Sequence, residues 1–92
     1  MNNQEKYLEK KLRDRVKEKG GLALKFVSPA YTGVPDRIVL MPGGKARFVE
    51  LKTEGRTPSE RQKLVIAELR KLGFSVSVIS TNDQLTEFLN CL

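Results

Sequence analysis

Histidine and tryptophan are absent from this 92-residue sequence, and cysteine occurs once, as Cys91. Without histidine the chain cannot use Ser-His-Asp or Cys-His catalysis, a histidine general base or a histidine-type zinc site. A lone cysteine cannot form an internal disulfide, which agrees with a reducing compartment. Any catalysis must therefore use carboxylates, lysines, hydroxyl groups and metal ions held by oxygen.

Long apolar runs are also missing. No segment has the roughly 20 apolar residues that a membrane span requires, and the N-terminal MNNQEKYLEKK lacks the apolar core of a signal peptide. We therefore expect a cytoplasmic protein without a membrane partner. A chain of this length fits a single domain over residues 1–92, because it cannot support two independent cores.

Positive charge is in excess. Seventeen Lys and Arg residues against eleven Asp and Glu give a formal charge of +6. Such a balance favours a polyanionic partner, nucleic acid first and an anionic membrane surface second. The alternative interpretation of these lysines is an ordinary solvated surface.

The spacing of apolar and turn-forming residues predicts seven elements. Leu8, Leu12 and Val16 recur every four residues, as on one face of a helix. The expected helices cover residues 4–19, about 59–72 and 82–90, and the expected strands cover 22–28, 36–41, 46–52 and 74–80, with a hairpin turn at 42–45. The order α-β-β-β-α-β-α predicts an α/β sandwich with a mixed sheet of about four strands flanked by helices.

The predicted hairpin brings two carboxylates together. In a ladder that turns around residues 42–45, facing residue numbers sum to about 86 or 87, so Asp36 lies opposite Glu50 or Leu51. Facing Cβ atoms are about 4.5–5.5 Å apart. Two negative charges at that separation repel each other unless something neutralises them, and a divalent cation would do so.

Alternation along the strand places Glu50 and Lys52 on one face and turns Leu51 the other way. The backbone carbonyl of Leu51 is then a further oxygen ligand. Two carboxylates, a carbonyl and water form the hard oxygen site that Mg²⁺ or Mn²⁺ prefers, and Lys52 could orient or help deprotonate the attacking water. The structural alternative is that Asp36 caps a turn, while Glu50 and Lys52 pair on an exposed edge strand.

Three short stretches carry a family resemblance: GVPDR at residues 33–37, FVELK at 48–52 and TEGRTPSERQ at 53–62. Together they resemble the PD-(D/E)xK nuclease superfamily. More narrowly, G-x-P-D followed by E-x-K and S-x-x-Q is similar to the virus-type replication-repair nuclease (VRR-NUC) domain, in its small stand-alone form found in phages and bacteria. The resemblance covers nearly the whole chain and implies a restriction-endonuclease-like fold.

The resemblance assigns roles to individual residues. It implies that Asp36 and Glu50 bind the metal and that Lys52 assists the nucleophilic water. Gln62 would be the glutamine of S-x-x-Q that leans into the site. Its place within an apolar helix stripe agrees, because a buried amide needs partners. The alternative is a glutamine that bonds the backbone at the start of its helix.

The family also places a glutamate of the first helix beside the site, as a catalytic residue and metal ligand. Glu5 and Glu9 are one turn apart and both lie on or beside the apolar face of that helix. We favour Glu9, because its distance from the glycine turn and the leucine three positions later resemble the related archaeal junction resolvases. Glu5 has the simpler interpretation of compensating the helix macrodipole.

The basic residues best placed to contact DNA are Lys25, Arg37, Arg56, Arg61 and Lys63. They are interpreted as phosphate contacts, which position DNA without reading its sequence. Lys25 has two equal interpretations, one of a side chain on the phosphate side of the site and one of a solvated strand residue.

The resemblance implies a Mg²⁺- or Mn²⁺-dependent, structure-specific DNA endonuclease that leaves a 5′-phosphate and needs no organic cofactor. Stand-alone members look like Holliday-junction-resolving homodimers, which would act on branched DNA in recombination or repair, in a bacterium or a phage-infected cell. Leu64, which points away from the apolar stripe of its helix, is a candidate dimer contact. The alternatives are a monomeric or subunit nuclease for flap, nicked or duplex DNA, a catalytically silent DNA-binding module, and a purely structural domain.

Overall fold

The computed structural model describes residues 3–92, so residues 1 and 2 of the predicted domain lie outside the described part. The helices are α1 (Asn3–Glu18), α2 (Glu60–Lys71) and α3 (Asn82–Asn90), and the strands are β1 (Leu22–Lys25), β2 (Arg37–Met41), β3 (Lys45–Leu51) and β4 (Ser75–Ile79). The order α1-β1-β2-β3-α2-β4-α3 confirms the predicted fold class. Strand β1 is shorter than predicted, although the Phe26 N–H still donates to the Asp36 carbonyl.

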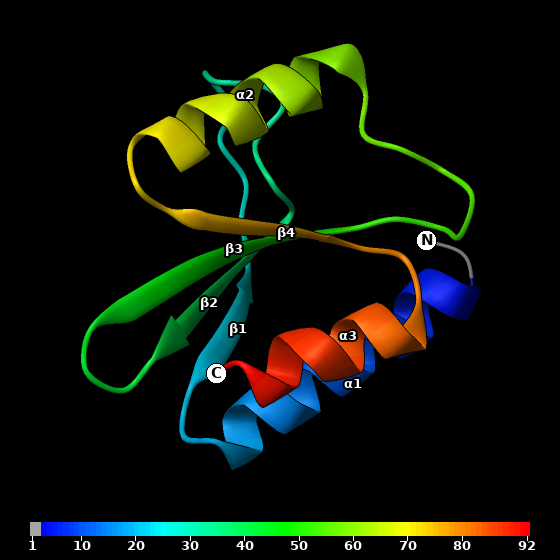
Figure 1. Ribbon diagram of the computed structural model, residues 1–92, viewed down its shortest axis with the longest axis vertical. Coiled ribbons are helices and arrows are strands. Elements are labelled where there is room, and N and C mark those ends of the chain that lie inside the picture. The colour runs from blue at the N-terminus through cyan, green and yellow to red at the C-terminus, as the bar shows by residue number, and fades with distance from the viewer. Residues whose placement is uncertain (1–2) are drawn as a thin grey trace.

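The four strands form one mixed sheet in the order β1-β2-β3-β4. Strands β1 to β3 are antiparallel neighbours, whereas β4 joins β3 in parallel through the α2 crossover. Figure 1 shows α1 and α3 side by side on one face of the sheet and α2 on the other. Among residues 3–92, no helix is long and apolar enough to cross a membrane.

The face under α1 and α3 is a closed apolar core. Leu8, Leu12 and Val16 of α1 pack against strand residues such as Val39 and Val49, and each of these side chains is at most 1% exposed. The i, i+4 spacing read from the sequence is thus the buried stripe of α1.

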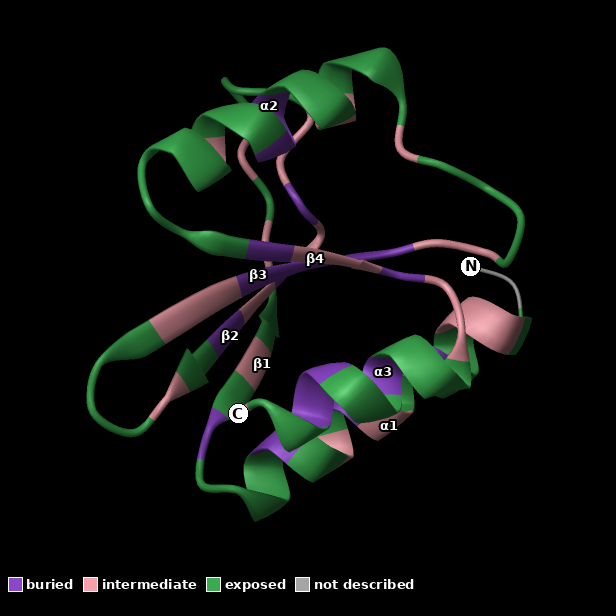
Figure 2. Ribbon diagram, in the orientation of Figure 1, coloured by how far each residue is buried: buried purple, intermediate pink, exposed green. Residues whose placement is uncertain are grey.

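The face under α2 is only partly covered. Phe48, Ile66 and Val76 are buried there, but four apolar side chains toward the hairpin end are not: Leu22 is 56% exposed, Leu24 44%, Leu40 38% and Phe74 43%. Leu22 and Leu40 face each other across β1 and β2. We call these four residues the apolar ledge, and Figure 2 shows much of this end of the sheet as exposed.

The β2–β3 hairpin fixes the register on which the site depends. Arg37 faces Val49 and Met41 faces Lys45, so facing residue numbers sum to 86, as predicted. The intervening turn uses Gly43 and Gly44 with φ of 87° and 76°, values that other residues rarely adopt. By extension of this ladder, Asp36 stands opposite Glu50 just beyond the paired residues.

Candidate active site

Asp36 and Glu50 are tied to each other's strands. The backbone N–H of Asp36 donates to Glu50 Oε1 at 3.1 Å, and the backbone N–H of Leu51 donates to Asp36 Oδ1 at 3.2 Å. These two bonds continue the hairpin ladder with side-chain oxygens in place of backbone carbonyls. The arrangement holds both carboxylates at the open end of the hairpin.

The second oxygen of Glu50 has two further partners. Gln62 Nε2 donates to Glu50 Oε2 at 3.0 Å, and Lys52 Nζ lies 3.2 Å from the same oxygen. Gln62 also fills the capping box of α2, because its backbone N–H donates to Ser59 Oγ and its Oε1 accepts from the Ser59 N–H. Both interpretations of Gln62 therefore hold at once: one end of the amide caps the helix and the other reaches the site.

Glu50 and Lys52 do pair, as the structural alternative expected, but its exposed edge strand is wrong. Strand β3 is an interior strand between β2 and β4, and Glu50 is only 3% exposed. A surface ion pair would cost little to form, but burying a carboxylate is unfavourable unless several partners compensate it. The structure supplies three such partners to Glu50: the Asp36 N–H before β2, Lys52 after β3 and Gln62 of α2.

Asp36 is electrostatically strained at this position. Burial, and then the negative charge of Glu50, raise its pKa from 3.8 to about 6, while the Leu51 N–H and Arg37 act in the opposite direction. Glu5 adds a smaller increase in the same pKa. Asp36 is thus harder to ionise than a free carboxyl, and a cation bound beside it would favour its charged form.

The first-helix acid is placed differently from the prediction. Glu9 does not join the carboxylate pair, because it binds Arg13 at 2.7 Å and lies 3.4 Å from the guanidinium of Arg37. Glu5 instead acts electrostatically on Asp36 and accepts a hydrogen bond from Thr53 Oγ1 at 2.8 Å. The geometry therefore favours Glu5 over Glu9.

The contact of Glu5 with the site depends on how the start of α1 is held. Glu5 lies one turn nearer the start of α1, and Gln4 beside it accepts a hydrogen bond from the Glu54 N–H, so the start of α1 is fastened to the loop after Lys52. Thr53 directly follows the E-x-K stretch and supplies the hydroxyl that Glu5 accepts. Sequence spacing alone could not show which turn of α1 meets that loop.

Arg37 also departs from its predicted role. It is 7% exposed, donates to the Asp36 carbonyl at 2.8 Å and contacts Glu9. Its guanidinium is thus a buried support for the backbone at Asp36 and is not presented to a phosphate. The other predicted DNA contacts, Lys25, Arg56, Arg61 and Lys63, are exposed.

The donor set fits a hard divalent cation. Asp36 Oδ2 forms no hydrogen bond within residues 3–92, and the Leu51 carbonyl points to the same side of β3 as its N–H, toward Asp36. Oxygen ligands of this kind suit Mg²⁺ or Mn²⁺. Within the described residues, however, no three Asp, Glu or Cys side chains cluster as a metal site, so the predicted three-acid ligand set with Glu9 is not assembled.

Comparisons with known proteins agree on one relationship. The model of a family described as "VRR-NUC domain" matches residues 3–83. A protein described as "Putative nuclease p44", from Acyrthosiphon pisum secondary endosymbiont phage 1, is 46% identical over 76 residues, which cover 83% of this chain and 82% of that protein. A solved structure described as "VRR_NUC domain" has a TM-score of 0.90 at 29% identity, covering 97% of each chain.

Proposed function

This chain belongs to the VRR-NUC domain family of nucleases, and on that premise we propose that it is a metal-dependent endonuclease that cleaves branched DNA. The observation that supports the site assignment is the environment of Glu50. A nearly fully buried carboxylate is held by the Asp36 backbone, Gln62 and Lys52, beside a second carboxylate whose pKa is raised. A merely structural pair would not need two carboxylates at one point.

Each residue has a distinct part in the proposed reaction. Asp36, Glu50 and the Leu51 carbonyl would hold Mg²⁺ or Mn²⁺, which supplies charge stabilisation at the phosphate and acidifies water. Lys52, whose ammonium group lies beside Glu50, orients the attacking water and stabilises negative charge on it. Gln62 fixes the carboxylate of Glu50 through a rigid helix cap, so that it keeps its orientation during the reaction.

The acid of α1 in this proposal is Glu5. Its negative charge reaches Asp36, whereas Glu9 neutralises Arg13 and Arg37. Glu5→Gln should therefore lower the cleavage rate more than Glu9→Gln. If Glu9→Gln were the more damaging change in a well-folded protein, the sequence-based choice of Glu9 would be restored.

A homodimer would suit a four-way junction, which needs two coordinated cuts. The apolar ledge is a surface that a second copy could cover, and Leu64, 55% exposed on α2, is a second candidate contact. Scattered exposed leucines are common, but two that face each other across neighbouring strands form a continuous patch. Light scattering at micromolar concentration should give about twice the 10.4 kDa mass of one chain.

The experiment that tests the proposal is a cleavage assay on four-way junction, flap and linear duplex DNA, each with Mn²⁺, Mg²⁺ or EDTA. Wild type is compared with Lys52→Ala and Asp36→Ala. We expect symmetric nicks in the junction that disappear in EDTA and in both variants.

Other outcomes discriminate between the alternatives. Preferential cleavage of flap or duplex DNA by a 10.4 kDa species would indicate a monomeric or subunit nuclease. DNA binding without cleavage in any metal would indicate a silent binding module. Unchanged cleavage by Lys52→Ala would show that the chemistry lies elsewhere.

A further inference from the structure

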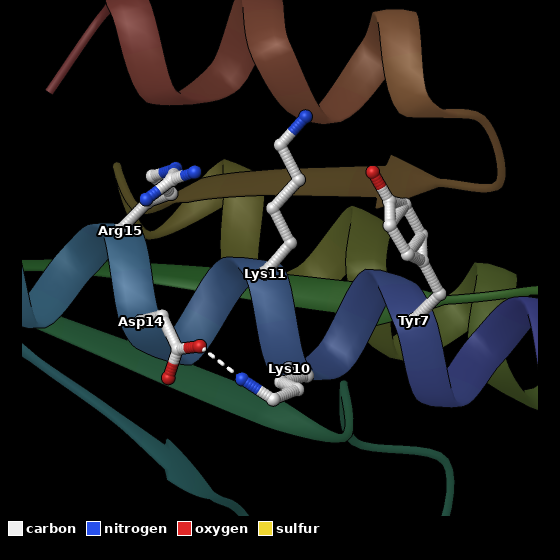
Figure 3. Close-up of a pocket in the computed structure, with 5 residues that line it drawn as sticks. All are labelled: Tyr7, Lys10, Lys11, Asp14 and Arg15. Carbon is white, nitrogen blue, oxygen red and sulfur yellow. Dashed lines mark hydrogen bonds and ion pairs between the residues drawn. The ribbon is translucent and has the colours of Figure 1, made fainter.

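A ridge of three side chains runs along α1, away from the candidate active site. Tyr7, Lys11 and Arg15 are four residues apart, so they stand one above the other on one face of the helix. Figure 3 shows them projecting to the same side, toward α3, while Lys10 and Asp14 pair on the other side. We call Tyr7, Lys11 and Arg15 the α1 ridge.

The α1 ridge stands between two hollows. One, of about 250 Å³, lies over α1 and is lined by the ridge together with Lys10 and Asp14. The other, of about 430 Å³, shares Lys11 and Arg15. It is also lined by residues of α3 and residues at and just after the end of α1: Glu18, Lys19, Thr86, Leu89 and Asn90. Both hollows are shallow and open, so together they form a surface track and not an enclosed small-molecule site.

The track is positively charged and carries an aromatic ring at one end. Lys11 donates to the neutral Asn82 side chain, so its charge is not compensated by that partner. Arg15 pairs with Glu18, but an exposed pair of this kind is weak and a phosphate can compete for the guanidinium. Tyr7 is 53% exposed, which leaves its ring available for stacking.

The track begins at the end of α1 that is nearer the candidate active site. Tyr7 is the ridge residue nearest the start of α1, and that start is fastened to the chain around the site by Gln4, which donates to the Ser80 carbonyl and accepts from the Glu54 N–H. A strand that leaves the site along α1 would therefore meet Tyr7 first, then Lys11, then Arg15. Cations interleaved with an aromatic ring are the features by which proteins hold single-stranded nucleic acid.

We propose that the α1 ridge binds an unpaired single strand of the DNA substrate as it leaves the active site. A base stacks on Tyr7 and the phosphates that follow contact Lys11 and Arg15. The proposal rests on the proposed nuclease function and concerns those branched substrates that carry a single-stranded segment next to the cut, such as a flap. Stacking needs an exposed base face, so fully paired duplex gains nothing from Tyr7.

The test compares binding of tailed and blunt DNA in EDTA, where no cleavage occurs. Fluorescence anisotropy is measured for a duplex with a 5′ or 3′ single-stranded tail and for the same duplex without a tail. Tyr7→Ala should weaken binding of one tailed form about tenfold and leave blunt duplex unchanged, whereas Tyr7→Phe, which keeps the ring, should bind like wild type. Circular dichroism checks that each variant is folded.

Salt dependence tests the two cations. For tailed DNA, the logarithm of the binding constant falls linearly with the logarithm of the salt concentration. Lys11→Gln and Arg15→Gln should each make this slope shallower by about one, because each removes a phosphate contact. Lys45→Gln, a matched change at the exposed hairpin turn, should leave the slope unchanged.

The outcomes separate this proposal from the proposed function. Suppose that wild type cleaves DNA but the α1 ridge variants bind tailed DNA as tightly as wild type does, or lose affinity for tailed and blunt DNA equally. Either result would show that the α1 ridge does not hold a single strand. If wild type neither binds nor cleaves any DNA form, the proposed function itself fails, and this proposal with it.

Discussion

The two faces of the sheet differ sharply, although they are built from the same strands. On β3, Val49 and Leu51 point into the closed core under α1 and α3, at 0% and 2% exposure. Glu50 between them points to the other face, where it meets Gln62 of α2. One face therefore holds apolar side chains that stabilise the fold, and the other holds a buried charge that destabilises it unless it is paired.

This difference separates the two tasks of a small domain. The closed face holds the larger apolar cluster, whereas the end of the other face holds Asp36 at an unfavourable pKa. Substitutions on the two faces should accordingly affect different properties. Changes at the site should lower activity, and changes in the closed core should lower stability.

The largest expected effect is on activity at Asp36. Asp36→Asn keeps the size of the side chain and an oxygen that can accept from the Leu51 N–H, but removes the charge that would hold the cation. We expect the cleavage rate to fall on the order of a thousandfold while the protein keeps its fold. Asp83→Asn, an exposed acid at the start of α3, is the control and should cleave like wild type.

The next effect is on stability in the closed core. Leu12→Ala should lower the free energy of unfolding by about 3 kcal/mol, because Leu12 is 0% exposed and its removal leaves a cavity. Leu24→Ala on the apolar ledge should lower it by less than about 1 kcal/mol in the monomer, since Leu24 is 44% exposed. Urea titration measures both values, and equal losses would mean that the two faces do not differ as described.

The pH dependence of stability should show the strain at Asp36. Its pKa in the folded protein, about 6, is above the ordinary 3.8, so ionisation is harder in the folded state. The free energy of unfolding is therefore highest when Asp36 is protonated, and it falls as pH rises from about 4 to 6. Because the group is partly exposed, we expect a loss on the order of 1–2 kcal/mol relative to Asp36→Asn.

Activity should change with pH in the opposite direction. If Asp36 holds a cation as proposed, a proton on Asp36 would compete with it, so cleavage should rise as pH increases through about 6, where the carboxyl ionises. Urea titrations and cleavage rates over the same pH range measure the two trends. If the free energy of unfolding of wild type and of Asp36→Asn changed with pH in the same way, the pKa of Asp36 would not be raised in the folded protein.

The smallest expected effect concerns two equivalent helix caps. Gln62 closes the capping box of α2 with Ser59, and Gln84 closes that of α3 with Thr81. Replacing either by Ala should lower the free energy of unfolding by about 1 kcal/mol. Only Gln62→Ala should also slow cleavage, by roughly tenfold, because Gln62 alone reaches Glu50. Similar cleavage rates for both variants would show that Gln62 acts only as a helix cap.

The sequence by itself determined the order of elements, the apolar stripe of α1 and the hairpin register. These features depend on local periodicity and turn chemistry, which neighbouring residues specify. Because the register follows from the glycine turn, the meeting of Asp36, Glu50 and Lys52 could also be read from the sequence. The two alternatives for Gln62 could be recognised, but not that a single amide fulfils both.

Only the tertiary structure decided which parts of α1 and β2 meet the site. Glu5 and Glu9 share a helix face, and the choice between them depends on how far α1 slides along the sheet, which packing of Leu8, Leu12 and Val16 sets. Arg37 follows Asp36 in the chain, yet its guanidinium is buried against Glu9 and does not reach the surface. Such contacts join residues far apart in sequence, so no local pattern encodes them.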